Sequence, residues 1–142
     1  MRWNSSSGIT VDIGPSQVTF MEADGAPVVL SPVVHLAPEG GRVRILSVGA
    51  PPGAGAAVRV EVFAQDQPPA GISKLDCLAA LFTHGLKAIV ERSLFRMKPD
   101  VVVRGAARLS QAWGGYERDL LTLALARAGA KRVLWTENES SM

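Results

Sequence analysis

A carboxylate beside a tight turn is the first candidate for chemistry in this sequence. Asp12 precedes a turn that contains Gly14, Pro15 and Ser16. From that position its side chain can contact a metal ion or a phosphate through water. It can also accept hydrogen bonds from backbone donors of its own turn, as aspartates near turns often do. The residues alone leave both interpretations open, and the second is the simpler.

Other residues that could carry chemistry are few. Asp100 and Glu137 each border a different apolar segment, so they could converge with Asp12 on two metal ions, as a nuclease requires. No spacing in the chain supports that arrangement. Cys77 is the only cysteine, and with only two histidines the chain has too few ligands for a zinc cluster. We therefore expect no metal site.

The composition predicts one globular domain without a membrane span. The 142 residues are 47% hydrophobic and 20% charged, which suits a chain that buries a core. A net charge of +2 is too small to indicate nucleic-acid binding by itself. No apolar run approaches the roughly 18 residues of a membrane span, and the first residues hold no apolar signal segment. A cytoplasmic location is the expectation.

Two further patterns fall short of a nucleic-acid or nucleotide site. The basic residues that could contact nucleic acid are Arg42, Arg44, Arg59, Lys87, Arg92, Arg96, Lys98 and Arg104. No aromatic residues are interleaved with them, so a solvated surface is the simpler interpretation. The glycine-rich stretch 49–55 lacks the Gly-Lys-Ser/Thr ending of a P-loop, and we expect a surface loop there.

The first half of the chain predicts an antiparallel meander followed by an insertion. Residues 8–14 and 17–22 alternate or are rich in β-branched side chains, and the turn between them is too short for a parallel crossover. Residues 27–36 predict a third strand, whose prolines suggest that it leaves the ladder or lies at an edge. Residues 42–48 and 58–63 add two strands outside the meander.

The clearest helix is predicted from residue 73 to about residue 92. Ser73 can cap it, and Asp76 stands three residues later, at the spacing of a capping box. The helical period places His84 toward solvent, away from the buried face. Cys77 is expected in the core or at its boundary and not as a nucleophile, because no histidine is placed beside it.

The last part of the chain predicts a parallel strand–helix–strand unit. Residues 101–103 form a continuous apolar run, typical of a strand covered on both faces. After a loop, a helix is predicted over 113–127, with Ser110 as its cap and Gly129 after its end. Residues 131–136 predict the last strand, joined by a right-handed crossover.

The predicted fold is therefore α/β, with the meander and the parallel unit in one mixed sheet and helices packed on it. Residues 8–138 are expected to form a single domain. Residues 1–7 are expected to be a disordered N-terminal segment, and residues 139–142 a polar tail.

This order of elements resembles the first, ribonuclease H-like subdomain of the actin-like superfamily, and within it the MreB-like bacterial rod-shape proteins. Residues 9–14 (ITVDIG) look like the first phosphate hairpin of that family, and residues 28–34 (VVLSPVV) look like its third strand. The stretch from residue 99 through residue 134 looks like its strand–helix–strand unit, including an Ala-Gly-Ala-Lys entry into the final strand.

The resemblance implies a phosphate site that is altered here. In the family the hairpin reads Asp-x-Gly-Thr/Ser, and its hydroxyl and backbone N–H groups meet phosphate. Asp12 and Gly14 match, but Pro15 stands at the hydroxyl position and Ser16 comes one residue late. Proline has neither a hydroxyl nor an N–H. Asn138 stands where the family orients the attacking water, and asparagine cannot act as a base.

The resemblance further implies a scaffold rather than an enzyme. The second wall of an actin-like nucleotide cleft is expected to lie beyond the end of this sequence. The function expected is a non-catalytic actin-like module that contacts a protein partner or a second copy, in connection with the bacterial cytoskeleton or cell shape. Trp3, Trp113 and Trp135 are candidates for such contacts, with the core as the competing interpretation. The alternative is a protein that binds ATP or GTP with Mg²⁺ through a degenerate site; nuclease activity and nucleic-acid binding are less supported.

Overall fold

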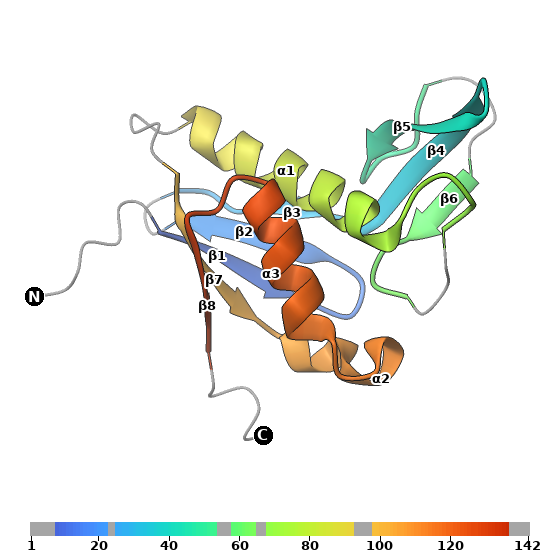
Figure 1. Cartoon of the computed structure of the whole chain (residues 1–142). Helices are drawn as coiled ribbons and strands as arrows, with labels where there is room; N and C mark the ends of the chain where they lie inside the picture. The colour runs from blue at the N-terminus through green and yellow to red at the C-terminus, as the bar shows by residue number, and fades with distance from the viewer. Residues whose placement is uncertain (1–7, 23–24, 54–57, 65–67, 93–97, 137–142) are drawn as a thin grey trace, which may run out of the picture.

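The computed structural model describes residues 8–22, 25–53, 58–64, 68–92 and 98–136. Within them the chain forms two sheets with helices packed against the larger one (Figure 1). The strands are β1 (Gly8–Ile13), β2 (Val18–Glu22), β3 (Val28–Leu30), β4 (Val33–Glu39), β5 (Arg42–Val48), β6 (Val58–Glu61), β7 (Asp100–Arg104) and β8 (Arg132–Trp135). The helices are α1 (Lys74–Arg92), the 3₁₀ helix η2 (Ala106–Leu109), α2 (Ser110–Trp113) and α3 (Glu117–Arg127).

The larger sheet has the strand order β3-β2-β1-β7-β8. β1 pairs antiparallel with β2, and β2 pairs antiparallel with β3, which confirms the predicted meander. On its other side β1 pairs parallel with β7, and β7 pairs parallel with β8. The mixed α/β class is therefore confirmed, and the apolar run 101–103 lies in β7 between two parallel neighbours.

The segment 27–36, predicted as one strand, is divided at Pro32. β3 ends at Leu30, and β4 begins at Val33 as the central strand of a second sheet with the order β5-β4-β6. The Val33 N–H donates to the Ser31 carbonyl at 2.8 Å, which closes a tight turn at the proline. Proline has no N–H for the ladder, so the chain leaves the first sheet there.

Both long helices cover the same face of the five-stranded sheet. α1 and α3 both lie in front of this sheet in Figure 1, at an angle to each other, and they are in contact. Phe20 of β2 meets Phe82 of α1 edge to face, with ring centroids 6.2 Å apart. Gly85 opens the space for the Phe20 ring, because a Cβ at that position would overlap it. The residues of β1 on this face, Ile9, Val11 and Ile13, are buried.

The opposite side of this sheet, which we call the second sheet face, carries half-buried side chains. Strand register places one row of four residues across it: Met21, Thr10, Val102 and Leu134. All four are half-buried, whereas the β1 residues that face the helices are 3% exposed or less. In the described part of the chain, the two long helices pack on the first face only.

The predicted helix 113–127 is interrupted by two glycines. Gly114 and Gly115 adopt φ angles of 63° and 89°, so α2 ends at Trp113 and α3 starts at Glu117. Ser110, predicted as the cap of the long helix, instead begins α2. The segment expected as a loop after β7 contains η2 and the start of α2. Two consecutive glycines offer the left-handed backbone that the interruption needs.

The end of α3 and the start of α1 agree with the sequence-based expectations. Gly129 has a φ of 110°, and its N–H donates to the Ala126 carbonyl at 3.1 Å, as expected for the glycine that follows a helix. At α1 the Ser73 N–H donates to Asp76 Oδ2, and the Asp76 N–H donates to Ser73 Oγ, both at 3.0 Å. This reciprocal pair is the predicted capping box.

Candidate functional site

The β1–β2 turn is closed by its own backbone. The Gly14 N–H donates to the Gln17 carbonyl at 2.9 Å, and Pro15 and Ser16 are exposed. One N–H of the turn is thus already used, and the next residue has none. Ser16 supplies an exposed hydroxyl. The turn therefore offers few donors for a phosphate group.

Asp12 lies on the second sheet face, beside this turn. Its backbone stands opposite Thr19 on one neighbouring strand and Arg104 on the other. Asp12 is half-buried in the middle of the sheet. Arg104, an exposed residue at the end of β7, is therefore the positively charged residue in register with Asp12.

The carboxylates that could form a nuclease site are not brought together. Asp100 pairs with Gly8 at the opposite end of β1 from Asp12, about 13 Å away along the strand. Glu137 lies outside the described residues. In the described ranges no group of three histidine, cysteine, aspartate or glutamate side chains is placed to hold a metal ion.

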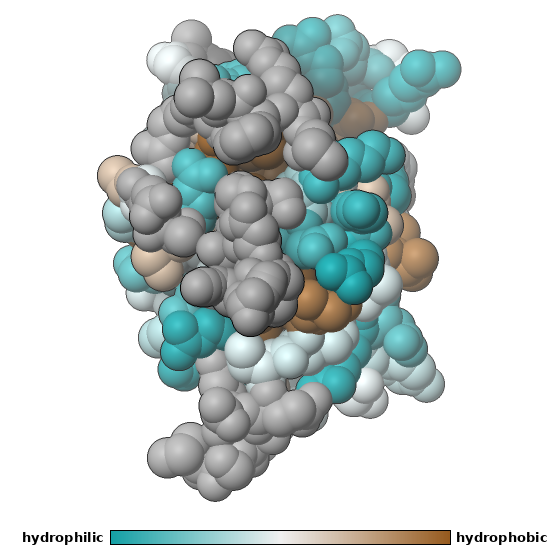
Figure 2. All heavy atoms as spheres, turned by 90° about the vertical axis from the view of Figure 1, so that its left-hand side faces the viewer, coloured by the Kyte–Doolittle hydropathy of each residue, from teal (hydrophilic) through white to brown (hydrophobic). Residues whose placement is uncertain are grey.

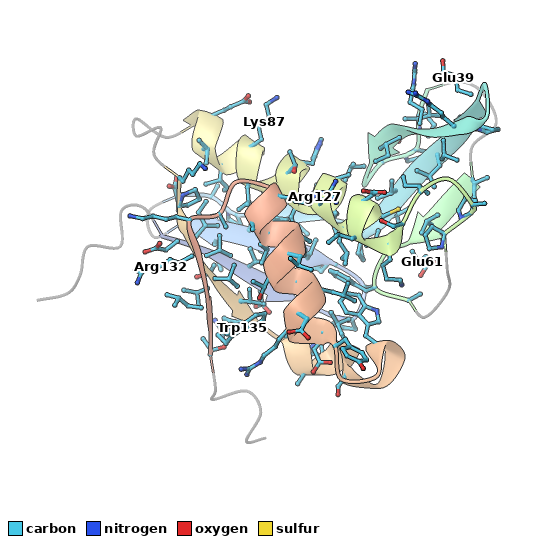
Figure 3. The ribbon with its side chains drawn as sticks, in the orientation of Figure 1. Glu39, Glu61, Lys87, Arg127, Arg132 and Trp135 are labelled. Atoms are coloured by element: carbon cyan, nitrogen blue, oxygen red, sulfur yellow. The ribbon has the colours of Figure 1, made fainter. Side chains whose placement is uncertain are left out.

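Asp100 is instead held by an arginine of the next strand. Arg132 Nη2 donates to Asp100 Oδ2 at 2.7 Å, and Nε donates to Oδ1 at 3.2 Å. These hydrogen bonds, more than the charge of Arg132, hold the pKa of the Asp100 carboxyl below its ordinary value. Arg132 stands at the opposite end of β8 from Trp135 (Figure 3). The pair thus links the first residues of the parallel strands β7 and β8, so its role is structural.

A small pocket lies at the other end of these strands. It has a volume of about 170 Å³ and is lined by residues from the ends of β7 and β8, from η2 and from the start of α3. The Arg118 guanidinium lies over the Trp135 ring, 5.0 Å from its centroid. Glu117 Oε1 is buried there, without a hydrogen-bond partner among the described residues. Pockets for drug-sized ligands have about 300–1,000 Å³, so this one is small for a nucleotide.

Gly105 joins this pocket to the β1–β2 hairpin. It has a φ of 83°, and a Cβ on it would overlap the Ile13 carbonyl oxygen. The loop after β7 therefore runs directly against the end of β1. This contact was not predicted, although a glycine directly after an apolar strand is a signal for close backbone approach.

The remaining predicted residues divide between the core, the surface and the undescribed ends. Trp113 is buried and packs beside Phe63, so its ring belongs to the core and is not a surface for contacts. Trp135 is half-buried at the pocket. Trp3 and Asn138 lie outside the described residues. Cys77 is buried, and burial raises the pKa of its thiol, as expected for a residue of the core.

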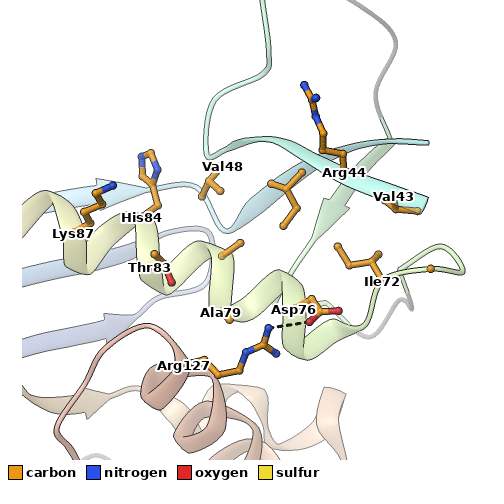
Figure 4. A pocket seen from close by; sticks show the side chains of 13 residues that line it. Val43, Arg44, Val48, Ile72, Asp76, Ala79, Thr83, His84, Lys87 and Arg127 are labelled. Atoms are coloured by element: carbon orange, nitrogen blue, oxygen red, sulfur yellow. Dashed lines mark hydrogen bonds and ion pairs between the residues drawn. The ribbon is translucent and has the colours of Figure 1, made fainter. Parts of the chain in front are cut away.

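A larger cavity, which we call the α1–β5 groove, lies between strand β5 and helix α1 and was not predicted. It has a volume of about 740 Å³ and separates β5 from one side of α1 (Figure 4). Its apolar lining comes from both elements and the segment before α1: Val43, Ile45, Val48, Ile72, Ala79 and Ala80. His84, which is exposed as predicted, lies on the rim with Lys87. The groove depends on how the insertion packs on the helix, which no local pattern reveals.

The end of the molecule on the left of Figure 1 has a different character. Hydrophilic side chains cover most of its described surface, and hydrophobic ones show there as separate small patches (Figure 2). None of the described helices is long and apolar enough to cross a membrane. No protein-family model and no curated protein sequence matches the chain.

Proposed function

We propose that this chain is a ribonuclease H-like domain of the actin-like, MreB-related type that acts through protein–protein contacts as a scaffold and not as an enzyme. The mixed sheet supports the fold part of the proposal, because an antiparallel meander followed by a parallel β–α–β unit is the arrangement expected for that type. A role beside the bacterial cytoskeleton or in cell shape follows from the resemblance to rod-shape proteins.

The structure of the β1–β2 turn is the observation that supports the absence of an enzymatic function. In the actin-like family this turn binds phosphate through a hydroxyl residue and backbone N–H groups. Here the Gly14 N–H is engaged by Gln17, and Pro15 supplies neither group. The small volume of the nearby pocket and the Glu117 carboxylate that lines it also disfavour a triphosphate.

The second sheet face supports the proposal that the chain acts through protein–protein contacts. Its row of Met21, Thr10, Val102 and Leu134 is half-buried and mostly apolar, in contrast to the charged surface of the helices. A sheet normally buries one or both faces against another layer. A partner protein or a second copy that packs on this row would supply that layer.

Light scattering after size-exclusion chromatography, at several concentrations, tests the contact part. We expect association of the purified chain, or of the chain with a protein that co-purifies with it. Leu134→Glu should weaken this association, because it places a charge in the row. Leu123→Glu is the matched control, since Leu123 is 54% exposed on α3. A strict monomer that retains no partner in a pull-down would contradict the scaffold role.

Titration calorimetry with ATP or GTP and Mg²⁺ tests the non-catalytic part. We expect no saturable heat up to millimolar nucleotide. The alternative, a nucleotide-binding protein with a degenerate site, has the exposed hydroxyl of Ser16 in its favour. Saturable binding that Asp12→Ala or Ser16→Ala weakens would establish that alternative and overturn the proposal.

A further inference from the structure

We infer that the α1–β5 groove binds an extended acidic segment of a partner protein, one that alternates carboxylate and aliphatic side chains. This inference rests on the proposed contact function and names the chemistry of the partner. It follows from the shape of the groove, from its lining and from the charges on its rim.

The shape of the groove suits an extended chain. One stripe of α1 lines it at helical spacing, from Asp76 through Ala80 and Thr83 to Lys87, which gives a length of about 17 Å. The length accommodates about five residues of an extended chain.

The two facing walls of the groove carry aliphatic side chains. Val43 and Ile45 of β5 form one wall, and Ala79 and Ala80 of α1 form the other, where short side chains leave room. Ile72 closes one end, beside Val43 in Figure 4. Aliphatic walls accept alternate side chains of an extended peptide. They lack the aromatic platforms on which nucleic-acid bases stack, so a peptide is favoured over RNA or single-stranded DNA.

The charges on the rim select an acidic occupant. The lining holds three cations, Arg44, Lys87 and Arg127, and one carboxylate, Asp76, which Arg127 contacts at 3.1 Å.

Two of these cations have weak partners. Arg44 lies 3.7 Å from Glu39, and Lys87 lies 4.0 Å from Glu91, with all four side chains more than 60% exposed. Exposed pairs of this kind contribute little, so the cations can exchange their partners for carboxylates of a ligand.

Fluorescence anisotropy with the full chain tests the inference. The probe is a short labelled peptide of alternating Glu and Leu, compared with a Lys and Leu peptide and with a labelled single-stranded RNA. We expect binding of the Glu-Leu peptide only. In NMR spectra of the labelled protein, the chemical-shift changes that this peptide causes should be confined to α1 and β5. Lys87→Glu should weaken binding about five- to tenfold at low salt. Arg108→Glu, an equal charge change at an exposed position of η2, should not.

A variant without a charge change separates the groove from general electrostatics. Ala80→Leu keeps a strong helix former in α1 and fills the groove, so binding should fall more than tenfold at any salt concentration. Circular dichroism confirms that each variant is folded. Equal binding of the Lys-Leu peptide, tighter binding of the RNA, or no binding of the Glu-Leu peptide at millimolar concentration would overturn the inference.

A failure of the groove inference can be distinguished from a failure of the proposed function. If the peptide does not bind while the chain still associates through the second sheet face, the groove inference falls and the scaffold proposal stands. Nucleotide binding at the β1–β2 turn would remove the scaffold proposal without affecting peptide binding in the groove.

Discussion

The close packing of α1 on the sheet depends on the absence of one side chain. Gly85 → Ala should destabilise the protein although alanine is the better helix former by about 1 kcal/mol. The added Cβ would overlap the ring of Phe20, which is fully buried and held by Phe82. Overpacking of this kind costs about 1–3 kcal/mol, and a fixed ring places it at the upper end. We expect a lower urea midpoint, with a net loss of about 1–2 kcal/mol.

The contact with Phe20 can be isolated by a double-mutant cycle. Phe20→Leu removes the ring edge that the new methyl would meet, so Gly85→Ala should lose less stability in that background. A single variant that is as stable as the natural chain, or losses that simply add, would show that the ring is not the obstacle.

Acid should lower the free energy of unfolding, because it protonates two aspartates that are paired in the folded protein. The pKa values of Asp76 and Asp100 are lowered in the folded state, chiefly by hydrogen bonds from the Ser73 backbone and from Arg132, respectively. A lowered folded-state pKa contributes stability above the ordinary value of 3.8, and this contribution is lost as the pH falls through the folded-state pKa.

The contribution of the strand-linking pair can be measured by urea unfolding at neutral and acid pH. Asp100→Asn and Arg132→Met each remove the same interaction, so both should be less stable than the natural chain at neutral pH. Both should approach it in acid, where the natural pair is also lost. A constant difference across the pH range would exclude the pair as the source.

Some single residues could be placed from the sequence and others could not. The capping box of Ser73 and Asp76 was predictable because both partners lie within one helical turn. The pair of Asp100 and Arg132 was not, because it depends on the register of two strands separated by a helix. For the candidate site, the lack of donors at Pro15 follows from its chemistry alone, whereas the internal use of the Gly14 N–H required the structure.

Among the elements, the junction of β7 with η2 is the most constrained by backbone contact. Gly105→Ala should cost about 3 kcal/mol or more, because it combines a positive φ with overlap against the Ile13 carbonyl. Backbone cannot move aside as a flexible side chain can. Gly114→Ala is the matched control: its φ is 63°, but no atom lies within 4 Å of the new methyl. Its loss should be about 1–2 kcal/mol. Equal urea midpoints for the two variants would refute this explanation.

The elements also show where local patterns stop being informative. The strand predicted over residues 27–36 is confirmed as extended structure, but the sequence carries no information about which sheet each part joins. Pro32 marks the division only once the second sheet is known. Likewise, the apolar spacing from 113 to 127 continues across Gly114 and Gly115, whose positive φ angles interrupt the helix.

At the scale of the whole molecule, the two sheets should differ in local stability. β1 and β7 are paired on both sides and their inward side chains are buried. β5 and β6 are the outer strands of a three-stranded sheet and are mostly half-buried or exposed. Amide hydrogen exchange followed by mass spectrometry should therefore be slowest in β1 and β7 and faster in β5 and β6. Uniform protection across both sheets would mean that they open as one unit.

The overall α/β class could be predicted because most strands and helices can be recognised from their own residues, by alternation or an apolar run for a strand and by helical spacing for a helix. The α1–β5 groove could not be predicted, because its two walls come from β5 and α1, which are separated in the sequence and whose contact no local pattern reveals. Two of its three cations, Arg44 and Lys87, were visible in the sequence as members of a scattered basic set. Only their position around one aliphatic cavity distinguishes them from the rest.

The parallel pairing of β1 with β7 has a consequence during synthesis. β1 is made first and lies at the centre of the sheet, yet one of its two neighbours begins only at Asp100. At about 5–20 residues per second, a nascent chain on the ribosome keeps that strand edge open for several seconds. During this time the N-terminal hairpin is open to strand pairing with other chains, so we expect the yield of native protein to depend on chaperones that shield this edge.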